Sequence, residues 1–167
     1  MAESLAGVLV NALHGIPPML IIFIISMIPI LELRGGIIAA SLLNIPMMHA
    51  IPICLLGNFI PIPFILLLIK PIFAWMKKLK LFRPFVEKLE AKSMSKSDKI
   101  QNYEFLGLLL FVGIPLPGTG AWTGSLIAAL LDIDFKKAVL ANFCGLLLAT
   151  TIMCFVSYGI PFLVSMI

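Results

Sequence analysis

The sequence has little charge for its length. Only 12% of its 167 residues are Asp, Glu, Lys or Arg, whereas soluble domains carry about 25%, and 61% are hydrophobic with a mean hydropathy of +1.13. So few polar side chains cannot cover the surface of a globule in water. The composition therefore disfavours a soluble enzyme, a nucleic-acid-binding protein and a disordered regulator. It predicts an all-α integral membrane protein.

Motifs for catalysis and metal binding are also missing. Cys54, Cys144 and Cys154 lie in apolar runs without CxxC spacing, so we expect them to be small hydrophobic residues. There is no GxxxxGK[ST] nucleotide loop, no HExxH zinc motif and no set of nucleophile, base and orienting residue. We expect no enzyme activity, no cofactor and no metal site. Residues 1–16 lack the basic start and cleavage site of a signal peptide and predict a short interfacial helix.

The charge that is present is concentrated in one segment. Residues 70–99 hold nine of the twelve Lys and Arg and three of the eight Asp and Glu, a net charge of +6 that leaves −2 elsewhere. Such a segment is expected to lie in the cytoplasm, at the membrane surface. Its apolar residues recur every three or four positions, which predicts a basic amphipathic helix kinked at Pro84. A solvated linker is the simpler interpretation. The apolar positions are Met76, Leu79, Phe82, Val86 and Leu89.

The remaining apolar segments are of two kinds. A spanning helix needs about 20 apolar residues, and residues 50–69 and 138–160 meet that length. Residues 17–43 are interrupted by ELRGG at 32–36, and residues 105–131 are interrupted by PLPGTG at 115–120. Each interrupted segment predicts a re-entrant helical hairpin, whose broken backbone is tolerated at membrane depth where it is buried in protein or lines a wet cavity.

An internal repeat relates the two halves. An offset of 88 residues aligns ten identities in a 38-residue window, among them Pro29 with Pro117 and Gly36 with Gly124. We therefore expect a single membrane domain in which residues 17–69 and 105–160 are repeats joined by a linker at 70–104. Because each repeat has one hairpin and one crossing, the second enters from the opposite side and the repeat is inverted. This topology puts Lys136 and Lys137 in the cytoplasm, whereas two single long spans would put them outside.

Two charged residues stand alone in the first hairpin. Glu32 and Arg34 would each cost about 2.5–3.5 kcal/mol at the centre of a membrane helix, so they must be compensated. A break at Gly35 and Gly36 is expected to let the two side chains meet. One interpretation is a buried ion pair that fixes the hairpin tip. The other is a functional site in which Glu32 binds a proton or cation and Arg34 binds an anionic group.

The second hairpin supplies the other candidate site residues. Its small residues permit close helix packing, or its backbone N–H groups form a nest at the start of the returning helix. Two helix N-termini aimed at one region make it positive, so we expect a preference for an anionic solute or a phosphate-bearing headgroup. Asp132, Asp134, Lys136 and Lys137 are interpreted as caps and anchors. The candidate residues in this hairpin are Pro117, Gly118, Thr119, Gly120, Trp122 and Thr123.

The ELRGGI and PLPGTGAWTGSLIA segments, in a chain near 160 residues long, resemble the bacterial and archaeal small multi-drug export proteins. The resemblance covers about residues 17–160. The sequence pattern is also similar to that of the wider DedA superfamily. It implies two re-entrant hairpins from opposite faces of the membrane, and either transport driven by the proton-motive force or lipid translocation. It also places the acidic and basic pair on Glu32 and Arg34 and the Gly-rich tip on 117–124. DedA proteins keep arginines in that hairpin, where Trp122 and Thr123 stand here.

Three functions follow from these patterns. The leading hypothesis is a secondary transporter of a small solute, coupled to protons through Glu32. The alternatives are a DedA-like lipid translocase or scramblase and a membrane scaffold without transport activity. The expected partners are the lipid bilayer, protons and a small solute or lipid headgroup, with no nucleic acid, and so small a unit is expected to form a homodimer. The resemblance implies a multi-pass protein of a bacterial or archaeal cell membrane.

Overall fold

The computed structural model describes residues 7–8, 15–94, 104–116 and 118–159, and these residues form helices without any strand. The predicted interfacial helix at 1–16 lies largely outside the described residues. In chain order the helices are α2 (Pro18–Met27), α3 (Glu32–Leu42), α4 (Met47–Phe59), α5 (Pro61–Lys78), α6 (Arg83–Met94), α8 (Glu104–Gly113), α9 (Ala121–Leu130), α10 (Phe135–Cys154) and the π-helical turn η1 (Phe155–Gly159).

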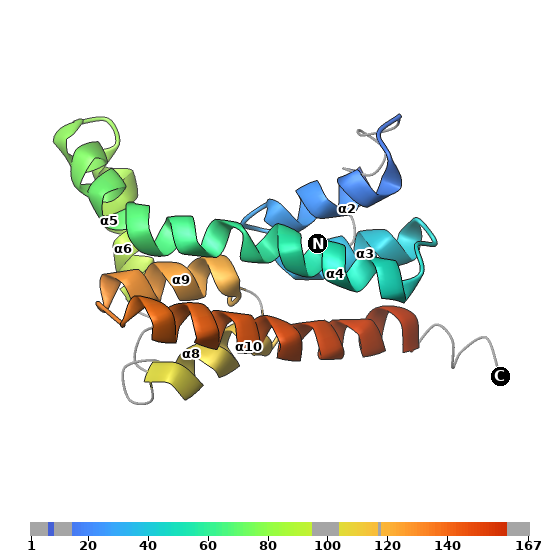
Figure 1. The fold of residues 1–167 in the computed structure, drawn as a ribbon. Helices are drawn as coiled ribbons and strands as arrows, with labels where there is room; N and C mark the ends of the chain where they lie inside the picture. The colour runs from blue at the N-terminus through green and yellow to red at the C-terminus, as the bar shows by residue number, and fades with distance from the viewer. Residues whose placement is uncertain (1–6, 9–14, 95–103, 117, 160–167) are drawn as a thin grey trace.

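Two long apolar helices match the predicted spans in position and are long enough to cross a membrane. The first consists of α4 and α5 and runs over Met47–Lys78. The second consists of α10 and η1 and runs over Phe135–Gly159. Within their most apolar stretches only 28% and 39% of the residues are buried in the protein, so most of these residues are at least partly exposed. The two run antiparallel along the molecule (Figure 1). At 1.5 Å per residue the first is about 48 Å long, so its basic end extends beyond a hydrocarbon core of about 30 Å.

Pairs of short helices precede both long helices, with breaks at 28–31 and 114–120. The second break falls in the predicted PLPGTG run. The expected break at Gly35 and Gly36 is wrong, because both glycines lie inside α3. The chain breaks earlier, around Pro29, which has no N–H to donate to a helix. Gly36 instead allows close packing, since a Cβ there would lie 1.9 Å from the Ser26 hydroxyl oxygen on α2.

The two halves match at the offset found in the sequence. Helices α4 and α10 begin at residues 47 and 135, which are 88 apart. Asn44 and Asp132, also 88 apart, follow α3 and α9 in the left-handed conformation, with φ of 53° and 56°. In both, the N–H of the next residue bonds back to the helix, at 2.9 and 3.0 Å. These caps support a repeat. Its inverted orientation and the re-entrant path through a membrane stay predictions.

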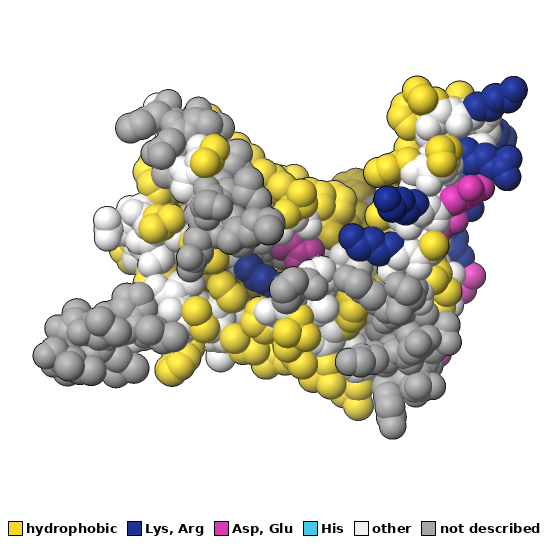
Figure 2. Space-filling model, turned by 180° about the vertical axis from the view of Figure 1, so that it is seen from behind, with side chains coloured by type: hydrophobic (Ala, Val, Ile, Leu, Met, Phe, Trp, Pro, Cys, Tyr) yellow, Lys and Arg dark blue, Asp and Glu magenta, His cyan; other side chains and the backbone are white. Residues whose placement is uncertain are grey.

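Part of the expected basic helix is present as α6, but the predicted kink at Pro84 is wrong, because the chain turns before this residue. Helix α5 ends at Lys78, a turn follows, and Pro84 is the second residue of α6, where its missing N–H has no helical partner to lose. Lys77 and Glu90 join α5 to α6 at 2.6 Å. Val86 is buried against Phe73 of α5 and Leu126 of α9. Val86 of α6 therefore packs on protein, whereas Phe85 is exposed, and Lys and Arg side chains gather at one edge of the molecule (Figure 2).

The hairpins approach each other from opposite ends of the molecule. Helices α2 and α3 lie beside α4, and helices α8 and α9 lie beside the first half of α10, with α9 also against α5 (Figure 1). The open ends of the two hairpins point in opposite directions. Their closed ends, which contain the breaks at 28–31 and 114–120, point toward the middle of the molecule (Figure 1). This arrangement brings the charged residues of the first hairpin onto the second.

Candidate functional site at the hairpin tips

Glu32 binds the start of a helix that follows 89 residues later. It is the first residue of α3 and only 5% exposed, and its φ of 52° is unusual for a residue other than glycine. Its carboxylate accepts hydrogen bonds from the backbone N–H groups of Ala121 at 3.1 Å and Trp122 at 3.0 Å. N–H groups in the first turn of a helix have no partners within it and form its positive end. Glu32 therefore caps α9.

Arg34 binds the other side of the same break. Its guanidinium donates to the carbonyl oxygens of Leu116 at 2.7 Å and Ile114 at 3.3 Å, and to the Thr119 hydroxyl at 3.1 Å. Both carbonyls lie just beyond the C-terminal end of α8, where the helix dipole is negative. The first hairpin thus supplies an anion to one end of the break and a cation to the other. We call these contacts the tip lock.

The expected direct ion pair is not formed. None of the salt bridges among the described residues joins Glu32 to Arg34. Residues two apart on a helix do not share a face, so each side chain reaches a different end of the second break. Arg34 still acts on Glu32 through Coulomb attraction. Figure 2 shows acidic and basic side chains together in a hollow of an otherwise hydrophobic face, away from the basic edge.

Glycine is required where Glu32 meets the second hairpin. Gly120 has a φ of 133°, and a Cβ there would lie 2.0 Å from the Glu32 Oε2 atom. Thr119 shapes the same turn, since its hydroxyl oxygen lies 2.8 Å from the Leu116 carbonyl, to which it donates, and accepts from Arg34. Gly118 is exposed in this turn. Pro117 lies outside the described residues.

The other candidates are less directly engaged. Gly35 and Gly36 are buried within α3. Thr123 is half-buried in the first turn of α9, and the described part of the chain gives it no hydrogen bond to Glu32 or Arg34. Trp122 contributes its backbone N–H, and its buried indole Nε1 has no partner among the described residues. The N–H groups that we expected to hold an anionic ligand hold Glu32 instead.

Sequence reasoning missed Asn58. This residue of α4 is fully buried, and neither Nδ2 nor Oδ1 has a hydrogen-bond partner in the described structure. Its amide nevertheless lies close enough to the Glu32 carboxylate to stabilise its charge. The sequence did contain a signal for this position. Asn58 is a polar residue within the apolar segment 50–69, and polar groups in spanning helices mark interior or functional positions.

One of the predicted caps is confirmed where the second hairpin ends, whereas the role of these residues as membrane anchors stays a prediction. The Asp134 carboxylate caps α10 by accepting from the Lys137 backbone N–H at 3.1 Å. Lys137 also pairs with Glu104 at 3.4 Å, and Asp132 pairs with Lys70 of α5. Lys136 forms no ion pair within the described residues.

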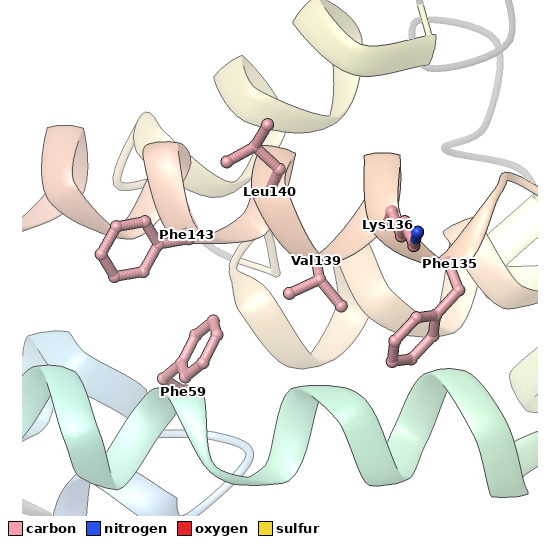
Figure 3. A pocket seen from close by; sticks show the side chains of 6 residues that line it. All are labelled: Phe59, Phe135, Lys136, Val139, Leu140 and Phe143. Carbon is pink, nitrogen blue, oxygen red and sulfur yellow. The ribbon is translucent and has the colours of Figure 1, made fainter.

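An apolar groove lies near this cap, between the long helices (Figure 3). Its volume is about 420 Å³, and Lys136 is the one charged residue in its lining. The rings of Phe59 on α4 and Phe143 on α10 pack edge to face, 5.5 Å apart. The other lining residues are Phe135, Val139 and Leu140.

An all-helical chain with two long outward-facing apolar helices and a buried charged site is a membrane protein. This chain belongs to the family described as "Putative small multi-drug export protein", whose model matches residues 32–152. The match begins at Glu32 and includes both sides of the tip lock. No curated protein and no solved structure matches the chain. Family membership agrees with the predicted class of membrane transport protein, whereas the DedA resemblance stays a prediction.

Proposed function

We propose that this chain is a proton-coupled secondary transporter of a small solute and that the tip lock is its gate. The observation that carries the proposal is the crossed pattern of contacts, in which Glu32 holds the N-terminus of α9 and Arg34 holds the C-terminal end of α8. A bond between helix ends that depends on one carboxylate is sensitive to protonation. The family name supports export as the direction of transport.

Protonation of Glu32 is the step that opens the gate. An ionised carboxylate accepts stronger hydrogen bonds from N–H groups than a neutral one, by roughly a factor of two in strength. When Glu32 gains a proton, its hold on Ala121 and Trp122 weakens and the start of α9 becomes available. A solute with a carboxylate or phosphate group fits the same N–H groups that Glu32 leaves. A proton and an anionic solute would then occupy the site together.

The topology of the sequence analysis belongs to this proposal. The hairpins α2–α3 and α8–α9 enter from opposite faces of a bacterial or archaeal cell membrane, and residues 70–99 lie in the cytoplasm. The excess of Lys and Arg in that segment supports this orientation. Two copies of the chain form a dimer that encloses the pathway.

Flux in proteoliposomes tests the proposal. We expect carboxyfluorescein, an anionic probe, to cross faster with a pH gradient than without one, and faster than the cation ethidium. Glu32→Gln should abolish the effect of the gradient, and Arg34→Gln should weaken anion flux. Glu104→Gln, which changes an exposed glutamate paired with Lys137, is the matched control and should behave like the unmodified protein. A preference for ethidium that Glu32→Gln abolishes and Arg34→Gln leaves intact would overturn the proposal.

The groove between the long helices favours a second candidate, a lipid translocase. An apolar groove lined by Lys136, which forms no ion pair within the described residues, suits an acyl chain below an anionic headgroup. In this case, liposomes containing the protein would mix fluorescent phosphatidylglycerol between leaflets without a pH gradient, and Val139→Trp, which fills the groove, would slow the mixing. Inactivity in both the solute and lipid assays would favour the scaffold hypothesis.

A further inference from the structure

We propose that the end of α5, the turn after it and α6 form a docking surface for anionic phospholipid headgroups. We call this part of the chain, residues 72–94, the elbow. It contributes no residue to the tip lock or to the lining of the groove between the long helices. The inference therefore goes beyond the proposed function and does not depend on transport.

The elbow turns away from the direction of the long helices. Pro71 lies inside α5, and helices commonly bend at an interior proline, which cannot donate a backbone hydrogen bond. Figure 1 shows the end of α5 and α6 extending to one side of the line that the two long helices follow. When the long helices cross a bilayer, the elbow therefore lies along the surface of that bilayer.

Protein contacts hold the elbow in this position. Phe73 of α5 and Val86 of α6 are buried together with Leu126 of α9. The ion pair between Lys77 and Glu90 joins the two helices of the elbow on another side. Because these contacts fix the orientation of the elbow, its exposed side chains present one constant surface.

That surface is apolar and aromatic. Trp75 is 63% exposed, Leu81 is 81% exposed and Phe85 is 60% exposed. Large apolar side chains that stay exposed together mark a surface that binds protein or membrane, and tryptophan is enriched where proteins meet the membrane–water interface. Two more exposed apolar residues, Ile72 and Leu79, lie three and four positions from Trp75 and share its face of α5.

The elbow is also basic. It contains six Lys and Arg and two Glu, a net charge of +4. Both glutamates are already paired, one with Lys77 and one with Arg83. Figure 2 shows Lys and Arg side chains along the outer edge of this projection, next to hydrophobic side chains. The exposed lysines of the elbow that form no ion pair within the described residues are Lys78, Lys80 and Lys88.

An anionic membrane surface matches both features. Apolar rings enter the boundary between headgroups and acyl chains, while lysine ammonium groups bind the lipid phosphates. The bilayer is also the nearest partner, because α5 is continuous with a long apolar helix. A second copy of the chain fits less well, since two of these surfaces placed face to face bring like charges together.

Quenching of Trp75 by lipid tests the proposal. The chain has two tryptophans, so Trp122→Phe leaves only Trp75 and keeps the backbone N–H that binds Glu32. The full chain is reconstituted in phosphatidylcholine vesicles that contain the same fraction of either brominated phosphatidylglycerol or brominated phosphatidylcholine. We expect the brominated phosphatidylglycerol to quench Trp75 at least twice as strongly. Salt at about 1 M should reduce this preference, because it screens exposed charges.

Charge variants in the same background show whether the lysines cause the preference. Replacing the three unpaired lysines together, as Lys78→Gln, Lys80→Gln and Lys88→Gln, should make the two lipids quench Trp75 equally. Lys137→Gln is the control, since it removes one exposed lysine of α10 that is paired with Glu104. It should leave the preference for phosphatidylglycerol unchanged.

The reciprocal chain, Trp75→Phe, reports on the other tryptophan. Trp122 is half-buried at the start of α9, so we expect both brominated lipids to quench it equally. Equal quenching of Trp75 by the two lipids at low salt would overturn the inference, as would a preference that survives the triple lysine variant. Quenching of Trp75 by neither lipid would also overturn it and would mean that protein covers the elbow.

Discussion

Glu32 and Arg34 carry opposite charges two residues apart, yet each acts on a separate helix end. Each side chain neutralises the end of a helix dipole that has the opposite sign. The positive φ of Glu32 adds backbone strain of about 1–3 kcal/mol, which the surrounding contacts must offset. Strain of this kind is common at functional sites, where a residue is held in a sparsely populated backbone conformation that places its side chain.

A double-mutant cycle should show that the two residues form one unit. We expect Glu32→Gln and Arg34→Gln each to lower the free energy of unfolding by about 3 kcal/mol, because each leaves a buried partner unpaired. The double variant should lose less than the sum, with a coupling of about 0.5–3 kcal/mol. Chemical unfolding in detergent measures these values. Additive losses would mean that the two contacts hold independent parts of the molecule.

Gly120 should tolerate no side chain. We expect Gly120→Ala to destabilise the protein by at least about 2 kcal/mol, because the new Cβ overlaps the Glu32 carboxylate and the φ of 133° strains an L-residue. Thermal unfolding checks this. Gly7→Ala is the control, since a Cβ there meets nothing within 4 Å. Equal stability of the two variants would show that Glu32 does not lie against Gly120.

At the scale of helices, close packing between α2 and α3 fixes the first hairpin. The glycine at position 36 lets α3 approach Ser26 of α2 and Cys54 of α4. The packing explains why a glycine pair that resembles a helix breaker lies inside a helix. Because Gly36 has no Cβ, the neighbouring helices can approach it closely. The chain is interrupted at Pro29 instead.

Removing the Ser26 hydroxyl should rescue a larger residue at position 36. We expect Gly36→Ala to cost about 1–3 kcal/mol through overpacking. Ser26→Ala alone should have a smaller effect, because the hydroxyl donates to the Ile22 carbonyl of its own helix at 2.7 Å, and that carbonyl keeps its place in the helix without it. In the double variant, the midpoint of thermal unfolding should recover part of the loss. Equal losses with and without the Ser26 hydroxyl would contradict the packing.

The two spans and the second break could be predicted from the sequence, because apolar length and a run of Pro and Gly act locally. The position of the first break could not, since a glycine has the same sequence signature in a break and in a close contact. The partners of Glu32 could not be predicted either. They lie 89 and 90 residues away, and only the fold brings them together.

At the scale of the whole molecule, the account combines two hairpins that meet tip to tip with two long helices beside them. We expect a cysteine at residue 137 to be labelled only from the cytoplasm and one at residue 49 only from outside. The chain for this test has Cys54, Cys144 and Cys154 replaced, and an impermeant maleimide is applied to intact cells. Labelling of residue 137 from outside would contradict the opposed hairpins and favour two single spans.

The central claim is that Glu32 closes the contact between the hairpins and that its protonation opens it. The distance between spin labels at Ile30 and Leu116, which are 82% and 54% exposed and lie in the two breaks, tests it most directly. We expect the distance to lengthen as the pH falls in the unmodified protein and in Glu104→Gln, and to be long at every pH in Glu32→Gln. One short distance at all pH values, unchanged by Glu32→Gln, would contradict the account.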